Sequence, residues 1–514
     1  MVPRVQGEPA SIRRPFVPRA EIHRRRINRY ADVTEITRAV PRRDVHPSGK
    51  GNCEMSKIPA TSAFQLCALP TALEGLTPYR LFAVYQIRFS AIKLSWSCNN
   101  SSCCALSVAF QNEQVMTSKK SVRPNDRISV LRLRQSLKMA RSAHAYVRGS
   151  TVKFYEWLER QKRGALPEGP AVWICGDCHV GNLGPVAAVD GRVDIQIRDL
   201  DQTVIGNPAH DIIRLALSLA TASRGSDLPG VTTARILEQV IEGYQAALRR
   251  DADAIDEAPK SIRFVMKRSI ARSWKHLANE RLENTKPTIP LGSRFWALSK
   301  SERATIEELF RTPALRHLAT SLRSRDDDAA VEFTDAAYWM KGCSSLGLLR
   351  FAVLLTVGSG KKRDMALMDV KEAVTAAAPR YARQKMPNDR AERVVEGAMN
   401  LSPHLGKRMV AGKIEGKSVF IRELLPQDLK IELERLRVSD AMKAASFLAG
   451  VVGKAHARQM DVATRKSWSS ELNRHRSKSL EAPSWLWTSV VALVGAHEIA
   501  YLEHCRKHAT SVIA

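Results

Sequence analysis

Aromatic residues and long hydrophobic runs are scarce in this 514-residue chain. Only 6% of its residues are Phe, Trp or Tyr, while 44% are hydrophobic, which is an ordinary fraction for a globular protein. The longest apolar run, Trp485 to Val494, is too short to span a bilayer. The first residues are basic and polar, and they lack the apolar segment of a secretory signal. We therefore expect a cytoplasmic location and no membrane partner.

Cysteines are few and unevenly placed. The nine cysteines give an odd number at irregular spacing, which does not match the framework of a disulfide-rich domain. A chain of this length buries a hydrophobic core without disulfides. The sequence also has no internal repeat and no low-complexity tract. These features indicate a globular protein from a reducing compartment.

Acidic residues are in deficit, because 52 Asp and Glu face 80 Lys and Arg, and the formal net charge is +28. A basic balance of this size favours anionic partners. Many of the basic residues lie on expected helices, however, and no aromatic residues interleave with them as on an RNA-binding sheet. We therefore expect anionic, phosphorylated ligands and no nucleic-acid partner, while the oligomeric state stays open.

Residues 1–115 differ in composition from the rest of the chain. They contain clusters of Pro, Arg and Ser and adjacent cysteines, and they have no sustained helical or strand periodicity. Met116 then begins a stretch that is typical of an ordinary protein start. We predict a poorly structured extension or a start site assigned too far upstream, and a small folded domain is the alternative.

From residue 116 the hydrophobic pattern predicts an α+β protein that is mostly helical. We expect a large helical lobe at 116–335, a small β-rich lobe at 336–435, and helices at 436–514 that return to the large lobe. Short apolar or alternating runs predict the strands. These expected strands are Pro170 to Ile174, Val193 to Ile197, Phe351 to Val357, Met365 to Val370 and Ser418 to Leu424.

The most specific segment is Cys175-Gly-Asp-Cys-His-Val-Gly-Asn182, followed by Ile197-Arg-Asp-Leu-Asp201. A carboxylate after a strand, an amide five residues later and a second carboxylate after the next strand suit Mg²⁺, which prefers oxygen ligands. Asp177 would accept a proton from an attacking hydroxyl, while Asn182 and Asp199 would bind the metal. The alternative is a structural loop whose Asp and Asn side chains cap turns.

A second set of residues is suited to nucleotide phosphates. A glycine-rich turn from Gly342 to Gly347 precedes one expected strand, Lys371 ends the next, and Glu392 or Glu396 on the following helix could pair with this lysine. The alternatives are a plain hairpin turn and a solvated lysine at a strand end. The residues that we expect to contact the nucleotide are Gly342, Ser344, Ser345, Gly347, Lys371 and Glu396.

The segment Gly176-Asp177-x-His179-x-Gly181-Asn182, with Asp199 and Asp211, resembles the catalytic and metal-binding loops of aminoglycoside-phosphotransferase-type kinases. Two positions differ, because Cys175 stands where these kinases usually have His and Leu200 stands where an aromatic residue is common. The resemblance implies ATP and Mg²⁺ as cofactors. It also implies a two-lobed, protein-kinase-like fold. The catalytic loop here precedes the glycine-rich turn, so we expect a circularly permuted order.

Residues from about 117 to about 510 also resemble a bacterial family of uncharacterised proteins, domain-of-unknown-function family 2252 (DUF2252). Several motifs carry this resemblance, and it implies no activity, because the family itself is uncharacterised. The motifs are Tyr146-Val-Arg-Gly149, the loop from Cys175, Lys341-Gly-Cys-Ser-Ser-Leu-Gly347, Asp369-Val-Lys-Glu372, Arg422-Glu-Leu-Leu-Pro-Gln-Asp428 and Ala455-His-Ala-Arg458.

These patterns together predict ATP- and Mg²⁺-dependent phosphoryl transfer to a small hydroxylated acceptor. A catalytically inactive, kinase-like protein that binds a nucleotide or serves as a scaffold is the alternative. Cys175, Cys178 and His179 also match the C-x-x-C-H pattern of haem attachment. A zinc site would need two further ligands, and none recurs nearby at metal spacing.

Overall fold

The computed structural model describes residues 121–225, 230–249, 258–283, 285–343, 345–431, 438–474 and 482–513. Contacts divide the chain into Met1–Glu74 and Gly75–Ala514, and all of the described residues belong to the second unit. The predicted extension at 1–115 and the predicted ligand Ser344 lie outside the described residues. With about 51% helix and 16% strand, the fold is α+β and mostly helical, which confirms the predicted α+β class.

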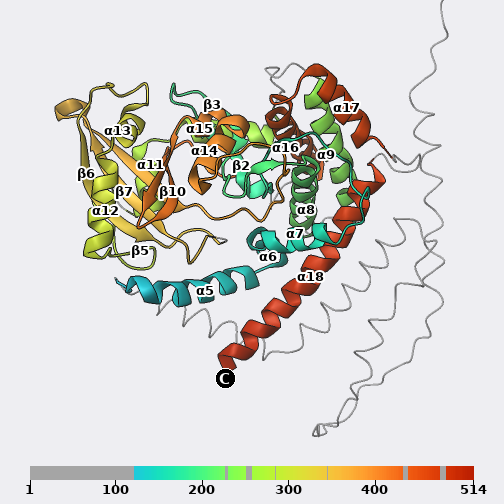
Figure 1. Cartoon of the computed structure of the whole chain (residues 1–514), viewed down its shortest axis with the longest axis horizontal. Helices are drawn as coiled ribbons and strands as arrows, with labels where there is room; N and C mark the ends of the chain where they lie inside the picture. The colour runs from blue at the N-terminus through green and yellow to red at the C-terminus, as the bar shows by residue number, and fades with distance from the viewer. Residues whose placement is uncertain are drawn as a thin grey trace, which may run out of the picture. The chain divides into compact units, whose positions relative to one another are not determined.

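Helices from both ends of the described chain pack together into one helical part (Figure 1, right). α16 packs against α8 and α9, and α18 packs against α5, α6 and α8. This part has one continuous hydrophobic core, to which Leu217, Leu237 and Leu448 contribute. α5 (Pro124–Ala140) runs from this part toward the sheet part, where its Leu131 joins the core of the sheet (Figure 1). The other helices are α6 (Ala143–Gly149), α7 (Thr151–Glu159), α8 (Ala209–Gly225), α9 (Gly230–Arg249), α10 (Lys260–Ile270), α16 (Val438–Ala457), α17 (Val462–Leu472) and α18 (Ser484–Ile513).

The sheet part, on the left in Figure 1, is an antiparallel sheet of six strands in the order β5-β6-β7-β8-β10-β9. The expected strands at Phe351 to Val357, Met365 to Val370 and Ser418 to Leu424 are present, and β5, β6 and β9 add to them. The strands are β5 (Phe295–Trp296), β6 (Val331–Trp339), β7 (Arg350–Val357), β8 (Asp364–Glu372), β9 (Met409–Ile414) and β10 (Lys417–Leu424).

Each face of the six-stranded sheet packs against different helices. Successive residues of a strand point to opposite faces. Phe351 and Val353 of β7 therefore join the core beneath α12 (Lys300–Phe310) and α13 (Pro313–Thr320). Ala352 and Leu354 pack with the core of α11 (Trp274–Leu282) on the other face. Arg350 lies on the same face as Leu354 but outside the core of α11, and it pairs there with Asp369.

Two small two-stranded sheets and two helices lie between these parts. β1 (Val172–Ile174) pairs with β4 (Val204–Gly206), and β2 (Leu183–Ala187) pairs with β3 (Val193–Ile197). The 3-10 turn η4 (Val180–Asn182) precedes β2, and α14 (Arg390–Leu401) and α15 (Pro403–Gly406) connect β8 to β9. The expected strands at Pro170 to Ile174 and Val193 to Ile197 correspond to β1 and β3. The segment from Cys175 to Asp201 therefore runs from the end of β1 through β2 and β3 to the loop before β4.

α18 is long and apolar enough to cross a membrane by length and composition alone. Within Ser484–His508, the most apolar stretch of 18 residues has a mean hydropathy of 1.2, and 44% of that stretch is buried in the protein. The helix packs against α5, α6 and α8. Long apolar helices also occur in the cores of large proteins, so this helix alone does not indicate a membrane protein.

Close packing of α9 against α16 depends on glycine. A Cβ added at Gly243 would overlap the carbonyl oxygen of Ser446, and one added at Gly453 would lie 2.7 Å from the oxygen of Tyr244. Gly243→Ala should therefore lower the free energy of unfolding by about 1–3 kcal/mol, because two backbones must move apart. Urea denaturation measures this change.

Gly495→Ala on α18 is the matched control, because a Cβ at that position meets no atom within 4 Å. Alanine favours a helix over glycine by about 1 kcal/mol, so this variant should be as stable as the parent or slightly more stable. Equal stability of the Gly243 and Gly495 variants would contradict the close contact between α9 and α16.

Candidate functional site

The loop after β1 is shaped by two local features. Gly176 has a φ of +74°, and a Cβ there would overlap the backbone oxygen of Gln202. His179 then caps η4, because its Nδ1 accepts a hydrogen bond from the backbone N–H of Gly181 at 3.1 Å. Asn182 Nδ2 donates to the backbone oxygen of Asp177 at 3.0 Å. The loop therefore brings Asp177 and Asn182 together although they are five residues apart.

Asp211, in the first turn of α8, holds this loop from below. Its buried carboxylate accepts hydrogen bonds from the backbone N–H of Cys175 at 2.7 Å and of Gly176 at 3.0 Å. His456 Nε2 of α16 lies 3.2 Å from the same carboxylate, and Tyr244 Oη lies 2.9 Å from His456 Nδ1. Because a carboxylate only accepts, Nε2 carries the proton and Nδ1 accepts from the tyrosine. Side chains of three distant helices thus fix the loop.

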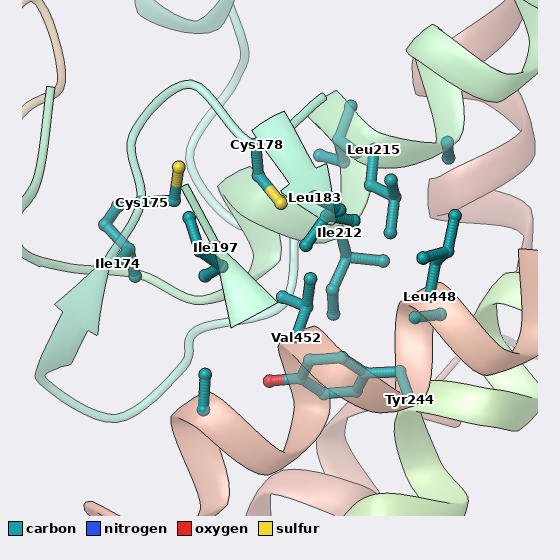
Figure 2. Close-up of a cluster of buried hydrophobic side chains, with 14 of the residues drawn as sticks. Ile174, Cys175, Cys178, Leu183, Ile197, Ile212, Leu215, Tyr244, Leu448 and Val452 are labelled. Atoms are coloured by element: carbon teal, nitrogen blue, oxygen red, sulfur yellow. The ribbon is translucent and has the colours of Figure 1, made fainter. Parts of the chain in front are cut away.

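Cys175 and Cys178 belong to the hydrophobic core, where they lie among Ile174, Leu183 and Ile197 (Figure 2). Both side chains are at most 1% exposed, which leaves no surface for a covalently attached haem. The hydrogen bond to Cys178 and burial raise the pKa of the Cys175 thiol well above its usual value.

Ligand atoms of Cys175, Cys178 and Asp211 lie within 4.8 Å of one another, a grouping that the sequence analysis missed. Both oxygens of Asp211 already accept backbone hydrogen bonds. We therefore assign these three side chains to the support of the loop.

The predicted metal and base residues share one small pocket. Lys371 of β8 reaches it from the sheet part, with Nζ 3.3 Å from Asp199 Oδ1 and in direct contact with Asp201. This contact joins two segments that lie 172 residues apart in sequence. The residues that line the pocket are Thr151, Asp177, Asn182, Asp199, Asp201 and Gln202. Thr151 and Gln202 were not expected there, and Asp201 was expected only as part of a motif.

The two carboxylates beside Lys371 differ in their electrostatics. Burial and the nearby negative charge of Asp199 raise the pKa of Asp201 to about 7. Burial acts on Asp199 as well, but the positive charge of Lys371 brings the pKa of Asp199 far below its usual range. Asp201 Oδ1 is also buried without a hydrogen bond to any described residue. A divalent cation would stabilise both ionised carboxylates and ligate this oxygen, so the residues present fit Mg²⁺.

Asp177 is held by a buried arginine of α8. Its Oδ1 accepts a hydrogen bond from Arg214 Nε at 2.9 Å, and Arg214 also donates to the backbone oxygen of Val147 at 2.6 Å. Burial raises the pKa of Asp177, although the charge of Arg214 opposes this effect. A raised pKa suits a carboxylate that accepts a proton. Arg214 was not expected from the sequence.

The expected pairing of Lys371 with a glutamate of α14 is replaced by pairing with Asp199 and Asp201. Glu392 and Glu396 are both exposed, because the buried face of α14 carries Val394, Gly397 and Ala398 instead. Arg393 of the same helix binds the backbone oxygens of Asp201, Thr203 and Val374. α14 therefore supports the acidic loop through an arginine.

The glycine-rich turn connects β6 to β7. Gly342 and Gly347 both have a φ of +97°, a conformation that favours glycine. Ser345 is buried, and its hydroxyl lies 3.4 Å from both Arg350 Nη1 and the oxygen of Lys341. A Cβ added at Gly149 of α6 would lie 3.0 Å from Cys343 Sγ. The turn thus lies against α6.

Residues 127–507 match the family model described as "Uncharacterized protein conserved in bacteria (DUF2252)". The chain belongs to the DUF2252 family. This membership confirms the resemblance seen in the sequence, but it assigns no activity to the protein. No curated protein and no solved structure matches the chain.

The role of Asp211 in this DUF2252 protein can be tested through stability. Asp211→Asn should lower the free energy of unfolding by about 1–3 kcal/mol, because the amide cannot accept from both buried N–H groups while facing His456. Chemical denaturation measures the change.

Asp190→Asn, on the β2–β3 turn, is the control and should leave the denaturation midpoint unchanged, since Asp190 Oδ2 pairs only with the exposed side chain of Arg192. An Asp211 variant that denatures like the parent would show that its carboxylate does not hold the loop.

Proposed function

We propose that this DUF2252 protein is an ATP- and Mg²⁺-dependent phosphotransferase that acts on a small hydroxylated acceptor. The observation that carries the proposal is the 3.3 Å contact of Lys371 Nζ with Asp199 Oδ1. The contact brings a strand-borne lysine against a carboxylate of the pocket that Asp177, Asn182 and Asp201 also line. Enzymes that transfer phosphoryl groups act mainly by positioning and electrostatic stabilisation, and they use a lysine, metal-binding Asp and Asn side chains and a base.

The order of elements supports a kinase-like fold in a permuted order. A hairpin with a glycine-rich turn (β6–β7) is followed by the lysine strand β8, the helix α14 and the hairpin β9–β10, and β10 lies next to β8. In protein kinases a glycine-rich loop, a strand lysine and a helix follow one another in this way. The catalytic loop that comes after them in kinases comes before them here.

The proposal gives each side chain of the pocket a role. Asn182 and Asp199 bind Mg²⁺, assisted by Asp201, and the ion neutralises charge on the phosphate oxygens. Because Asn182 Nδ2 already donates to the Asp177 backbone, its Oδ1 is oriented for a cation. Lys371 binds a phosphate oxygen, and Asp177 accepts the proton of the acceptor hydroxyl.

A nucleotide-binding protein without transfer activity is the second candidate. Two observations favour it: the 2.9 Å ion pair between Asp177 and Arg214 and the cysteine at position 175, where the kinases that this loop resembles usually have histidine. A carboxylate engaged by a buried arginine is a weaker base, because the positive charge stabilises its ionised form.

Asp199→Asn tests the metal site. Loss of the carboxylate should weaken Mg-ATP binding at least about 100-fold, or about 2.7 kcal/mol, as measured by titration calorimetry. Glu396→Gln is the control, because Glu396 is exposed on α14, and it should bind Mg-ATP like the parent. Equal affinity of the parent and the Asp199 variant would contradict the proposed metal site.

Asp177→Asn separates the two candidate functions. If Asp177 is the base, the variant should bind Mg-ATP but transfer the γ-phosphate about 10²–10⁴ times more slowly, as followed by ADP release with a panel of hydroxylated acceptors. Thermal unfolding of both proteins shows whether the change acts through stability. Tight Mg-ATP binding by the parent without γ-phosphate transfer to any acceptor would favour the protein without transfer activity.

A further inference from the structure

The surroundings of Asp199 hold more positive charge than a metal–nucleotide complex would balance. Eight cationic side chains from both parts of the fold interact there, and we call them the cation cluster. Four carboxylates pair with members of the cluster, namely Asp199, Asp201, Asp369 and Glu280. The cation cluster consists of Arg148, Arg198, Arg281, Lys341, Arg350, Lys371, Arg422 and Lys430.

Direct contacts connect the two parts of the cluster. Arg422 of β10 donates to the backbone oxygen of Arg198 at 2.7 Å, and its other terminal nitrogen lies 3.4 Å from Asp369 Oδ2. Arg350 of β7 pairs with the same carboxylate at 2.6 Å. Asp369 is therefore shared by two arginines, and it can neutralise only one of them.

Several members of the cluster have no acidic partner. In the described part of the chain, Arg148, Lys341 and Lys430 form no ion pair. Arg198 donates to the backbone oxygen of Asp428 at 2.9 Å, but the Asp428 carboxylate pairs with Arg408.

Three arginines of the cluster each have a buried N–H group without a hydrogen-bond acceptor among the described residues. The Nε atoms of Arg148, Arg281 and Arg422 are buried, and they make no hydrogen bond to any described residue. Buried donors of this kind are costly unless a ligand or water accepts from them.

Burial and the like charges of the cluster act together on its two unpaired lysines. The partial enclosure of its ammonium group and the positive charges of Arg148 and Arg198 lower the pKa of Lys430 to about 8. Burial and the charge of Arg281 hold the pKa of Lys341 well below its usual range. Cations repel one another in this way when no anion lies between them, and a bound anion removes the cost.

The cluster is continuous with the pocket of Asp177. A Cβ added at Gly181 would lie 2.9 Å from an Nη atom of Arg148, so this guanidinium covers the residue just before Asn182. Lys430 interacts electrostatically with both Asp199 and Arg281. An anion held by these cations would therefore lie beside the proposed site of transfer.

The charges suggest what kind of anion this is. Counted as formal charges, the eight cations and four carboxylates leave four positive charges. A Mg²⁺ ion with a fully ionised triphosphate carries about two negative charges. A phosphate monoester carries about −1.5 to −2 at pH 7, which is close to the charge that is still unbalanced.

We propose that the acceptor is itself a phosphorylated small molecule whose phosphate is bound by Arg148, Arg198, Arg281 and Lys430. This inference rests on the proposed function. The acceptor oxygen forms a bond to the γ-phosphorus, and its proton passes to the Asp177 carboxylate. The bond from the γ-phosphorus to the β–γ bridging oxygen breaks, and its electron pair leaves with ADP.

Inorganic phosphate is the probe for this site. Calorimetric titration of the full chain with phosphate, at constant ionic strength and with EDTA in place of Mg²⁺, should show saturable binding. Lys430→Gln, an exposed position where folding is not at risk, should weaken binding about fivefold, and Arg148→Gln should weaken it similarly. Lys407→Gln, an exposed lysine outside the cluster, should bind like the parent.

Two further titrations separate this inference from the proposed function. Asp199→Asn should keep phosphate binding, because it removes a negative charge, even where it loses Mg-ATP. Phosphate should also bind to the parent saturated with Mg-ATP. Displacement of phosphate by Mg-ATP would assign the cluster to the nucleotide and overturn the inference, as would absent binding or equal affinities in the Lys430 and Lys407 variants.

Discussion

The ammonium group of Lys371 lies between Asp199 and Asp201 while its side chain is only 4% exposed. A lysine this deeply buried is stable only beside carboxylates, because an isolated charge in the interior is strongly disfavoured. The lysine comes from the sheet and the carboxylates come from the loop after β3, so this one contact aligns the two parts of the fold. Removal of both carboxylates would leave the ammonium group of Lys371 buried and unpaired, whereas either carboxylate alone still pairs with it. The position of Lys371 therefore depends on the acidic loop after β3.

In the helical part, side chains from different helices fix the loop that carries Asp177. Asp211, His456 and Tyr244 come from α8, α16 and α9, and they fix the loop that carries Asp177 through side-chain hydrogen bonds. Such contacts depend on where side chains lie in space and are independent of the order in which the helices are connected. These contacts are thus compatible with more than one order of the elements along the chain, provided that the connections run along the surface.

Local patterns in the sequence were enough to predict several strands and part of the candidate site. The strands β7, β8 and β10 are short β-branched or apolar runs, and the grouping of Asp177, Asn182 and Asp199 follows from loops at the ends of short strands. The partner of Lys371 could not be found in this way. The side of α14 that faces the protein is decided by packing of Gly397 against Thr203, which turns Glu396 to solvent. Arg214 lies 37 residues from Asp177 in the sequence, and the cation cluster combines residues from segments between 148 and 430, for which no sequence spacing gives a signal.

The two faces of the sheet also constrain how a ligand is recognised. α11 packs its apolar side chains, including Leu277 and Leu282, against the face that carries Leu354 and Leu367. The end of that face nearest Asp199 carries Arg350, Asp369 and Lys371 instead. Apolar surface for a ligand is therefore limited there, and charge is abundant. Recognition at this site must come mainly from electrostatic and hydrogen-bonding contacts, which weaken as salt screens exposed charges and persist where the charges are buried.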